Sequence, residues 1–196
     1  RDHGCDWSSD VCSSDLTNIL VELGYAIASG GCPTGPDRSA FIGVYGHKSK
    51  DKSKHRIYIS WDGMAGLDHN PEIGIYNAQL FENYGVAKAI ASIARSGFHG
   101  LGKGGIAHHT RNAYQVLWDD LCSLTDFVVF YAEPTGKHGR VKGGTATAVY
   151  IAVDHGIPIF NLYYPDVLAR VEQFVANVKA HAIKKKESTD GSRISK

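Results

Sequence analysis

The chain has 196 residues, of which 43% are hydrophobic and 21% are charged, a composition typical of one globular domain with a sizeable core. Its 21 basic residues nearly balance 20 acidic ones, and a net charge of +1 argues against binding to nucleic acid or anionic membranes through a broad basic field. No stretch has the roughly 20 apolar residues of a membrane span, and no secretory leader opens the chain. We therefore expect a cytoplasmic protein with no membrane partner.

The first sixteen residues do not match the rest of the chain. Asp6 to Leu16 has neither helical nor strand periodicity, and it matches the translation of a widely used sequencing adapter. We interpret residues 1–16 as a non-native scar and leave them out of the fold prediction. The scar contains Cys5 and Cys12. The other two cysteines lie too far apart to indicate a zinc site or a disulfide framework.

From Thr17 onward, helices and strands are predicted to alternate. Residues 17–24 indicate the end of a helix with a glycine cap, 25–28 a short strand, and 38–45 a helix. A helix in first place is unusual for a doubly wound sheet, where it normally follows a strand. We expect that the scar has replaced a first strand and its ligand-facing loop.

The middle of the chain is predicted to hold one strand and one helix. Lys48 to Arg56 is a charged loop that is either simply solvated or a rim that steers phosphate. A strand follows over 56–61, and Trp61 at its end either closes the core or stacks on a base. Residues 71–97 hold a helix, and 99–105 form a mobile loop.

The rest of the chain continues the alternation. Predicted helices cover 110–117, with Thr110 as the N-cap, 145–154 and 165–183, and predicted strands cover 126–132 and 157–162. Residues 184–196 form a basic tail that we expect to be disordered. The pattern predicts a single α/β domain over 17–183. Its expected fold is Rossmann-like and doubly wound, with a mostly parallel sheet and helices on both faces.

Two glycine-rich segments each follow a predicted strand and open a predicted helix. One is Ser29 to Asp37 and the other is Lys142 to Ala148. Ligands bind parallel sheets at the carboxyl ends of the strands, so both segments can line one crevice. Glycines let backbone N–H groups approach a ligand, and a helix N-terminus attracts anions. The segments predict a phosphate cradle, and an ordinary tight turn is the alternative.

Arg111 opens a predicted helix near the same sheet edge. Its guanidinium group can chelate a phosphate, or it can pair with a carboxylate at that edge. His108 and His109 are adjacent and cannot both face one metal ion, so no metal site is expected. His99, His108 and His138 are placed in loops bordering the crevice, where protonated imidazoles can contact an anion.

Four motifs in chain order resemble the SLOG superfamily of Rossmann-like proteins, which includes DNA-processing protein A and the "Lonely guy" phosphoribohydrolases. The motifs are Ser29-Gly30-Gly31 with Gly35-Pro36-Asp37, Thr110 to Leu117, Lys142 to Ala148, and Gly156 to Leu162. The resemblance covers Thr17 to about Leu162 and is closest to small, often phage-encoded members. It implies a nucleotide-like ligand. Members usually open with a strand ending in Gly-Ser-Arg or similar, which this chain lacks.

The enzymatic branch of that superfamily fits only in part. "Lonely guy" enzymes remove the base from a nucleoside monophosphate with an arginine and with the glutamate of a Gly-Gly-x-Gly-Thr-x-x-Glu pattern. Arg111 fits the arginine, but the glutamate position falls on Val149 or Tyr150. An oxocarbenium-like transition state then lacks its usual electrostatic stabiliser. The next carboxylate, Asp154, lies a turn further on, and Asp37 or Glu133 is left as a substitute.

The sequence therefore favours binding over cleavage. We expect a protein that binds a nucleotide or nucleotide-derived small molecule, as a sensor or a sequestering protein, without a cofactor. An N-glycosidic hydrolase acting on nucleoside monophosphates is the alternative, single-stranded DNA binding is a third, and self-association is left open. The predicted ligand-binding residues are Ser29, Gly30, Gly31, Gly35, Asp37, Arg111, Asn112, Gly143, Gly144, Thr145 and Thr147.

Overall fold

The computed structural model describes residues 10–46, 52–135, 141–167, 169–171, 173–174, 176–177 and 180. The predicted scar before Asp10, residues 48–51 of the charged loop, His138 and the basic tail lie outside these residues. None of the helices in the described part of the chain is long and apolar enough to cross a membrane.

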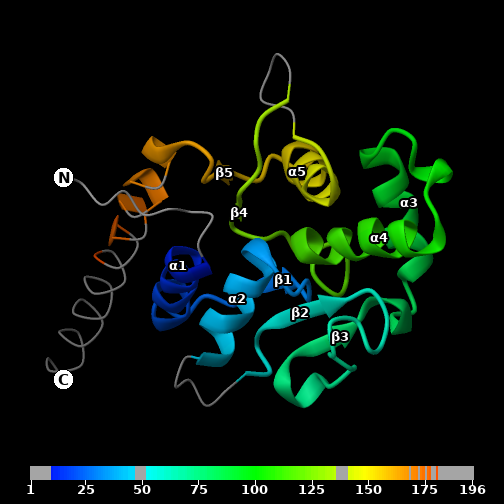
Figure 1. Cartoon of the computed structure of the whole chain (residues 1–196), viewed down its shortest axis with the longest axis horizontal. Coiled ribbons are helices and arrows are strands. Elements are labelled where there is room, and N and C mark those ends of the chain that lie inside the picture. Colours follow the sequence, from blue (N-terminus) through cyan, green and yellow to red (C-terminus); the bar gives the residue numbers. More distant parts are fainter. Residues whose placement is uncertain are drawn as a thin grey trace, which may run out of the picture.

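Helices and short strands alternate along the chain, as Figure 1 shows. The α-helices are α1 (Asp10–Glu22), α2 (Gly35–Gly46), α3 (Tyr84–Ala94), α4 (Lys103–Leu117) and α5 (Gly144–Asp154). The strands are β1 (Ala28–Gly30), β2 (Arg56–Ile59), β3 (Ile75–Asn77), β4 (Val128–Phe130) and β5 (Ile159–Asn161). Three 3-10 helices, η1 (Pro71–Ile73), η2 (Ala78–Leu80) and η3 (Phe98–Gly100), join some of them. The described residues between 165 and 180 are also helical.

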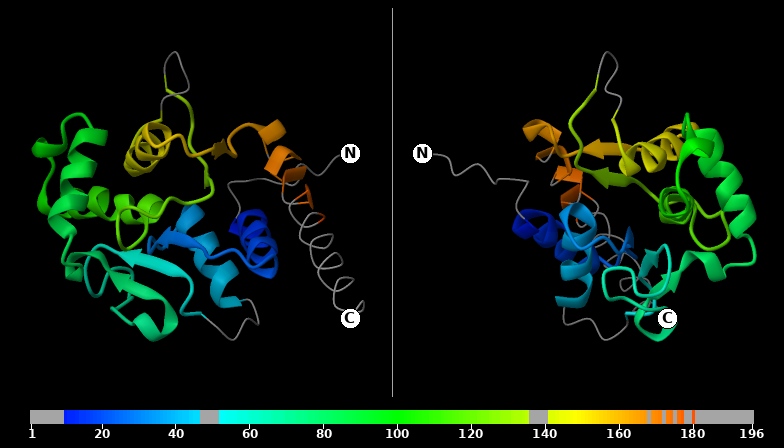
Figure 2. Two further views of the ribbon diagram at one scale, coloured as in Figure 1. Left: turned by 180° about the vertical axis from the view of Figure 1, so that it is seen from behind. Right: turned by 45° about the vertical axis from the view of Figure 1, so that its right-hand side comes forward.

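The five strands in the described part of the chain pair in parallel, and they form two sheets instead of the single sheet that we predicted. The first sheet has the order β1-β2-β3, and the second pairs β4 with β5. In Figure 1 and in the left view of Figure 2, α4 lies between the first sheet and α5. The parallel α/β class is confirmed, whereas a single doubly wound sheet is not what the described residues form.

Helices cover both faces of the first sheet. Successive side chains of β2 point to opposite faces, so each face packs against a different helix. Ile57 and Ile59 pack on one face against Phe41 of α2. Tyr58 points to the other face and packs with Tyr114 of α4, at a ring-centroid distance of 5.7 Å. Residues 57–59 of β2 are therefore all buried and have large apolar or aromatic side chains, as is usual in parallel sheets.

The second sheet is also covered on both faces. Phe130 of β4 packs with Ala146 of α5 on one side. Val129, on the opposite face, packs in a cluster with Leu16 and Leu20 of α1 and with Val171. Helix α1 therefore contributes to the core beside β4, although it precedes β1 in the chain.

Helix α1 is longer than the predicted helix end. It begins at Asp10, so it includes residues 10–16 of the segment that matches an adapter. Its predicted glycine cap is confirmed, since Gly24 has φ +93° and the N–H of Tyr25 donates to the carbonyl of Leu20 (3.0 Å).

The helix predicted over 71–97 is wrong for its first half. Gly74, with φ +80°, ends a 3-10 turn there, and Ile75 then pairs with Ile57 as part of β3. Only the alanine-rich second half is helical, as α3. Neither length nor periodicity distinguished a three-residue strand from a helix turn in this window.

The start of α4 is a second correction. The helix begins at Lys103, inside the predicted mobile loop, and ends at Leu117. Thr110 is therefore not an N-cap. It lies in the middle of α4, fully buried, and its hydroxyl donates to the carbonyl of Ile106 (2.8 Å), a common alternative for a threonine within a helix.

Candidate functional site

A cavity of about 730 Å³ lies between β1, α4, β4 and the start of α5. Six predicted ligand-binding residues line it, namely Ser29, Asp37, Arg111, Asn112, Gly144 and Thr145. The other five, Gly30, Gly31, Gly35, Gly143 and Thr147, are not among its lining residues. The two predicted glycine segments and Arg111 therefore do meet at one cavity, in a size range usual for small-molecule sites.

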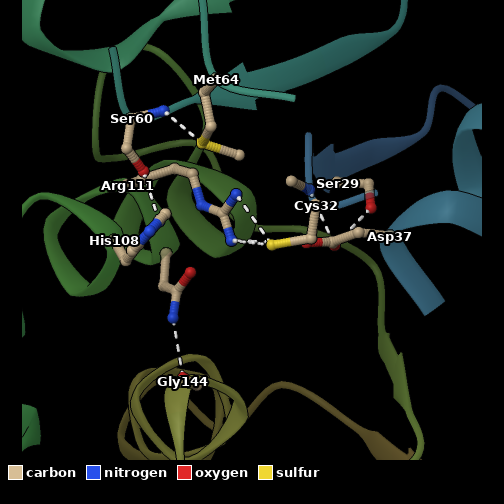
Figure 3. Close-up of polar contacts among 10 residues, drawn as sticks. Ser29, Cys32, Asp37, Ser60, Met64, His108, Arg111 and Gly144 are labelled. Atoms are coloured by element: carbon tan, nitrogen blue, oxygen red, sulfur yellow. Dashed lines mark hydrogen bonds and ion pairs between the residues drawn. The ribbon is translucent and has the colours of Figure 1, made fainter. Parts of the chain in front are cut away.

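Arg111 is the central charged group of this cavity (Figure 3). It is only 5% exposed, and one terminal nitrogen, Nη2, lies 3.4 Å from a carboxylate oxygen of Asp37. Both terminal nitrogens also lie 3.7–3.8 Å from the sulfur of Cys32. The Nε–H is buried, and among the described residues it has no hydrogen-bond partner. Arg111 thus pairs with a carboxylate at the sheet edge, one of our two sequence readings, and keeps a free donor.

Asp37 is held in place by three groups. Its Oδ1 accepts hydrogen bonds from the hydroxyl of Ser29 and the N–H of Gly30, both at 2.9 Å. Burial alone would raise the pKa of Asp37, but the charge of Arg111 and these hydrogen bonds outweigh it and hold the pKa below its usual value. Asp37 is therefore ionised at neutral pH, and its main role in this structure is to orient Arg111.

Gly30 is needed for this arrangement. A Cβ atom at Gly30 would overlap Asp37 Oδ2 and the guanidinium group of Arg111. The absence of a side chain at Gly30 therefore lets the backbone approach the ion pair of Arg111 and Asp37. The sequence had predicted a close approach to a ligand.

At the start of α5, the backbone N–H groups of Gly144 and Thr145 form no hydrogen bond with another described residue. Gly143, the N-cap, has φ +77° and ψ −158°, a conformation essentially restricted to glycine, and it supplies no side-chain cap. Asn112 donates its amide to the carbonyl of Gly144 (2.8 Å), which fixes α5 against α4. Gly144 and Thr145 line the cavity at the positive end of the helix dipole.

His108 lies in α4 and not in a loop, which corrects its predicted place. It lines the cavity one helical turn before Arg111, and its Nδ1 lies 2.9 Å from the hydroxyl oxygen of Ser60. Burial, with a smaller effect of Arg111, lowers the pKa of His108, so the neutral imidazole dominates at neutral pH. It therefore acts as a polar group and not as a second cation. Trp61 packs against it, with ring centroids 4.8 Å apart.

Two further predicted anion contacts are not part of the site in this structure. His99 lies in η3, on the exposed surface, and does not line the cavity. Thr147 is fully buried, and its hydroxyl is hydrogen-bonded to His109 Nδ1 (2.7 Å). Thr147 therefore connects α5 to α4 instead of facing a ligand.

The lowered pKa of His109 predicts that the folded protein loses stability in acid. Burial, together with Arg95, lowers its pKa to about 4 in the folded protein, against about 6.5 in an unfolded chain. Between these values the unfolded state binds more protons, so stability falls as the pH falls. We expect the free energy of unfolding to drop by about 1–3 kcal/mol between pH 7 and pH 4, as measured by urea denaturation. His109→Gln should flatten this dependence, and the exposed His99→Gln should not. Equal slopes for all three proteins would contradict the assignment.

Of the residues considered for a catalytic carboxylate, only Asp37 lines the cavity. Val149 packs in the cluster around Phe130, Tyr150 is 41% exposed, and neither lines the cavity. Glu133 and Asp154 are exposed and also lie outside the lining. At the Arg111 end of the cavity the carboxylate is Asp37, already engaged by Arg111.

Sequence reasoning missed Cys32 as part of the site, and it placed His108 beside the crevice in a loop instead of in α4. Cys32 was treated as an ordinary thiol, although it sits within the first glycine segment. Burial raises the pKa of its thiol, so it is protonated at neutral pH. The helical spacing of His108 to Arg111 and Gln115, three to four residues apart, was a signal that α4 begins earlier and presents one face to the cavity.

Compared with known proteins, the chain matches no protein-family model, no curated protein and no solved structure.

Proposed function

We propose that the protein binds a nucleotide or a nucleotide-derived small molecule in the cavity beside Arg111, as a Rossmann-like protein of the SLOG type. The observation that carries the proposal is the meeting of Arg111 with the uncapped N-terminus of α5 on one cavity of about 730 Å³. In this proposal the phosphate lies against Arg111 and the backbone N–H groups of Gly144 and Thr145. The ribose or base lies near Ser29 and Asp37.

The charges around Arg111 support an anionic ligand. The guanidinium group is nearly fully buried, and its ion pair with Asp37 is long, at 3.4 Å. Its Nε–H has no partner in the described part of the chain, and a buried donor without a partner costs about 1–3 kcal/mol. A phosphate oxygen that accepts from this group would remove that cost and form a charge-assisted hydrogen bond.

The same contacts favour binding over hydrolysis. A hydrolase of this type needs a carboxylate near the anomeric carbon to stabilise positive charge. Asp37 already accepts hydrogen bonds from Ser29 and Gly30 and pairs with Arg111. Its negative charge is therefore largely compensated within the protein.

The test uses Thr145→Asp, because this change separates folding from binding. An acidic residue in the first turn of α5 should stabilise the helix by about 0.3–1 kcal/mol through the helix dipole. It also places a negative charge where the phosphate should lie. We expect Thr145→Asp to bind nucleotides at least about tenfold more weakly than the original chain, a change of about 1.4 kcal/mol, without loss of thermal stability.

Calorimetric titration with the four nucleoside 5′-monophosphates, NAD, ADP-ribose and cyclic nucleotides checks this expectation. Thr145→Ser is the matched control and should bind like the original chain. If no ligand of the panel binds the original chain, or if Thr145→Asp binds as well as Thr145→Ser, the proposal is wrong. Release of free base during the titration would establish the hydrolase alternative instead.

Single-stranded DNA binding predicts a different dependence on salt. A protein that contacts several phosphates of a DNA strand loses affinity with a log–log slope of about −0.7 per phosphate. A ligand with one phosphate group at Arg111 should give a slope no steeper than about −1 or −2. Measuring affinity at several salt concentrations distinguishes the two cases, and a slope of about −4 or steeper would favour DNA.

A further inference from the structure

Ser60 lies directly after β2, and each of its polar groups contacts one other side chain. Its N–H donates to the sulfur of Met64 (3.4 Å), and its carbonyl accepts from the amide of Gln79 (2.6 Å). Its hydroxyl oxygen lies 2.9 Å from Nδ1 of His108, as Figure 3 shows. Ser60 is fully buried, and in the described part of the chain its hydroxyl has no other hydrogen-bond partner. Among the described residues, His108 Nδ1 is therefore the acceptor for the hydroxyl hydrogen.

This contact fixes the tautomer of His108. If Nδ1 carried the proton, the Ser60 hydroxyl would accept from it, and the hydrogen of that hydroxyl would be buried without an acceptor. Such a buried, unpaired donor is costly, so the favoured arrangement has the hydroxyl donating to Nδ1. A neutral imidazole then carries its proton on Nε2. His108 is therefore a hydrogen-bond donor at its other ring nitrogen.

The donor of His108 is open to the cavity. Among the described residues Nε2 has no hydrogen-bond partner, and it is not one of the buried atoms that lack a partner. Because His108 lines the cavity, a ligand there can reach this nitrogen. Trp61 packs against the imidazole at a ring-centroid distance of 4.8 Å, and a Cβ atom at Gly104 would lie 3.7 Å from the same indole. Ser60 and Trp61 therefore fix the position of the imidazole.

Hydrogen-bond donors predominate at this end of the cavity. Besides His108, they are the Nε–H of Arg111 and the backbone N–H groups of Gly144 and Thr145, none of which is paired with a described residue. The carboxylate at this end, Asp37, is already engaged within the protein. A ligand hydroxyl would need an acceptor for its hydrogen, whereas ionised phosphate oxygens only accept. Phosphate oxygens are therefore the groups that fit these donors.

The donors lie at two positions along α4. His108 and Arg111 are three residues apart on the same face, which is about 4.5 Å along the helix axis. Arg111 lies beside the start of α5, whereas His108 lies nearer the start of α4, where Gly105 also lines the cavity. The first turn of α4 has no acidic residue, and its N-cap, Gly102, has no side-chain cap. The positive end of the α4 dipole therefore favours an anion on the His108 side as well.

We infer that His108 is a specificity-determining residue that donates from Nε2 to a second phosphate group of the ligand, next to the phosphate at Arg111 and the start of α5. This rests on the proposed function and names its ligand class, which is a molecule with two linked phosphate groups. Ser60 is a positioning residue, because it acts on the ligand only through His108. A cavity of about 730 Å³ is large enough for a ligand of this size.

The first experiment measures the tautomer of His108 in the ligand-free full chain at neutral pH. The nitrogen-15 chemical shifts of the imidazole distinguish a protonated ring nitrogen from an unprotonated one. We expect the proton on Nε2 in the original chain and a mixture of both tautomers in Ser60→Ala, where the hydroxyl donor is missing. A proton on Nδ1 in the original chain would overturn the inference.

The second experiment compares ligands that differ by one phosphate group. The full chain is titrated calorimetrically with the 5′-monophosphate and the 5′-diphosphate of each nucleoside, and with inorganic phosphate and diphosphate as probes without a base. We expect each diphosphate to bind at least about tenfold more tightly than the monophosphate of the same base, as one added charge-assisted hydrogen bond allows. ADP-ribose carries the diphosphate inside the molecule, so its comparison with ADP shows whether the group is terminal or internal.

Variants of His108 assign this preference to one side chain. His108→Leu should weaken diphosphate binding at least about tenfold more than monophosphate binding, and His108→Gln, which keeps an N–H donor, should recover part of the loss. His99→Leu is the matched control, because His99 is exposed and does not line the cavity, and it should keep the full preference.

The outcomes separate this inference from the proposed function. If monophosphates bind but diphosphates bind no more tightly, or if His108→Leu weakens both equally, His108 does not contact a second phosphate, while the proposed function stands. If no nucleotide binds the original chain, both are wrong.

Discussion

Arg111→Ala should lower the free energy of unfolding by about 3 kcal/mol and abolish nucleotide binding. The guanidinium group is 5% exposed and pairs with Asp37, and removing one partner of a buried pair typically costs about 3–5 kcal/mol. The loss should lie at the lower end of that range, because Asp37 keeps its hydrogen bonds from Ser29 and Gly30. Urea denaturation at pH 7 measures the effect.

A matched control is available on the neighbouring helix. Arg38 of α2 is exposed and does not line the cavity, so Arg38→Ala should change stability by no more than about 0.5 kcal/mol. In the Arg111→Ala background, Asp37→Asn should cost less than it does alone, since the two charges act as one unit. Two results would show that the ion pair does not fix this end of the cavity. One is that Arg111→Ala lowers the free energy of unfolding by less than about 1 kcal/mol. The other is that the effects of Arg111→Ala and Asp37→Asn are strictly additive.

Gly30→Ala should destabilise the protein by about 2–3 kcal/mol, although it adds only one methyl group. The new Cβ atom would overlap both Asp37 and Arg111, which are themselves fixed by hydrogen bonds and by α4. Overpacking of a well-filled core typically costs about 1–3 kcal/mol, and here the ion pair must also move. Thermal and urea denaturation measure the loss.

Gly85→Ala is the control with the opposite sign. Gly85 lies in the first turns of α3 with open space around its Cα, so alanine there should raise stability by up to about 1 kcal/mol. Comparing Gly30→Ala with Gly85→Ala separates the effect of close packing at Gly30 from any general effect of replacing glycine. If Gly30→Ala is as stable as the original chain, the close contact between β1 and Arg111 is not a constraint on the fold.

The long, strongly periodic segments were predictable from the sequence. The pattern around Ala148 gave helix α5 within a residue of its bounds, and the run before Tyr131 gave β4. The convergence of Ser29 and Asp37 with Gly144 and Thr145 also followed from the sequence, because carboxyl ends of parallel strands share an edge. These features depend on periodicity and on general rules of parallel sheets.

What could not be predicted depends on tertiary contacts. Strand β3 has only three residues, and its pairing with Ile57 decides its conformation more than its own propensity does. The role of Thr147 was missed because its partner, His109, is 38 residues away in the chain. Gly30 was expected at a ligand contact, and the structure instead uses it to admit the pair of Arg111 and Asp37.

The central claim is that a phosphate group sits between Arg111 and the start of α5, and nuclear magnetic resonance tests it most directly. Nitrogen-15-labelled protein is titrated with a mixture of the four nucleoside 5′-monophosphates and, separately, with the four nucleosides. We predict that the backbone amides of Gly144 and Thr145 and the Nε–H of Arg111 shift with the nucleotides and stay in place with the nucleosides. Nucleotide-induced shifts confined to other residues, or none at all, would contradict the proposed site.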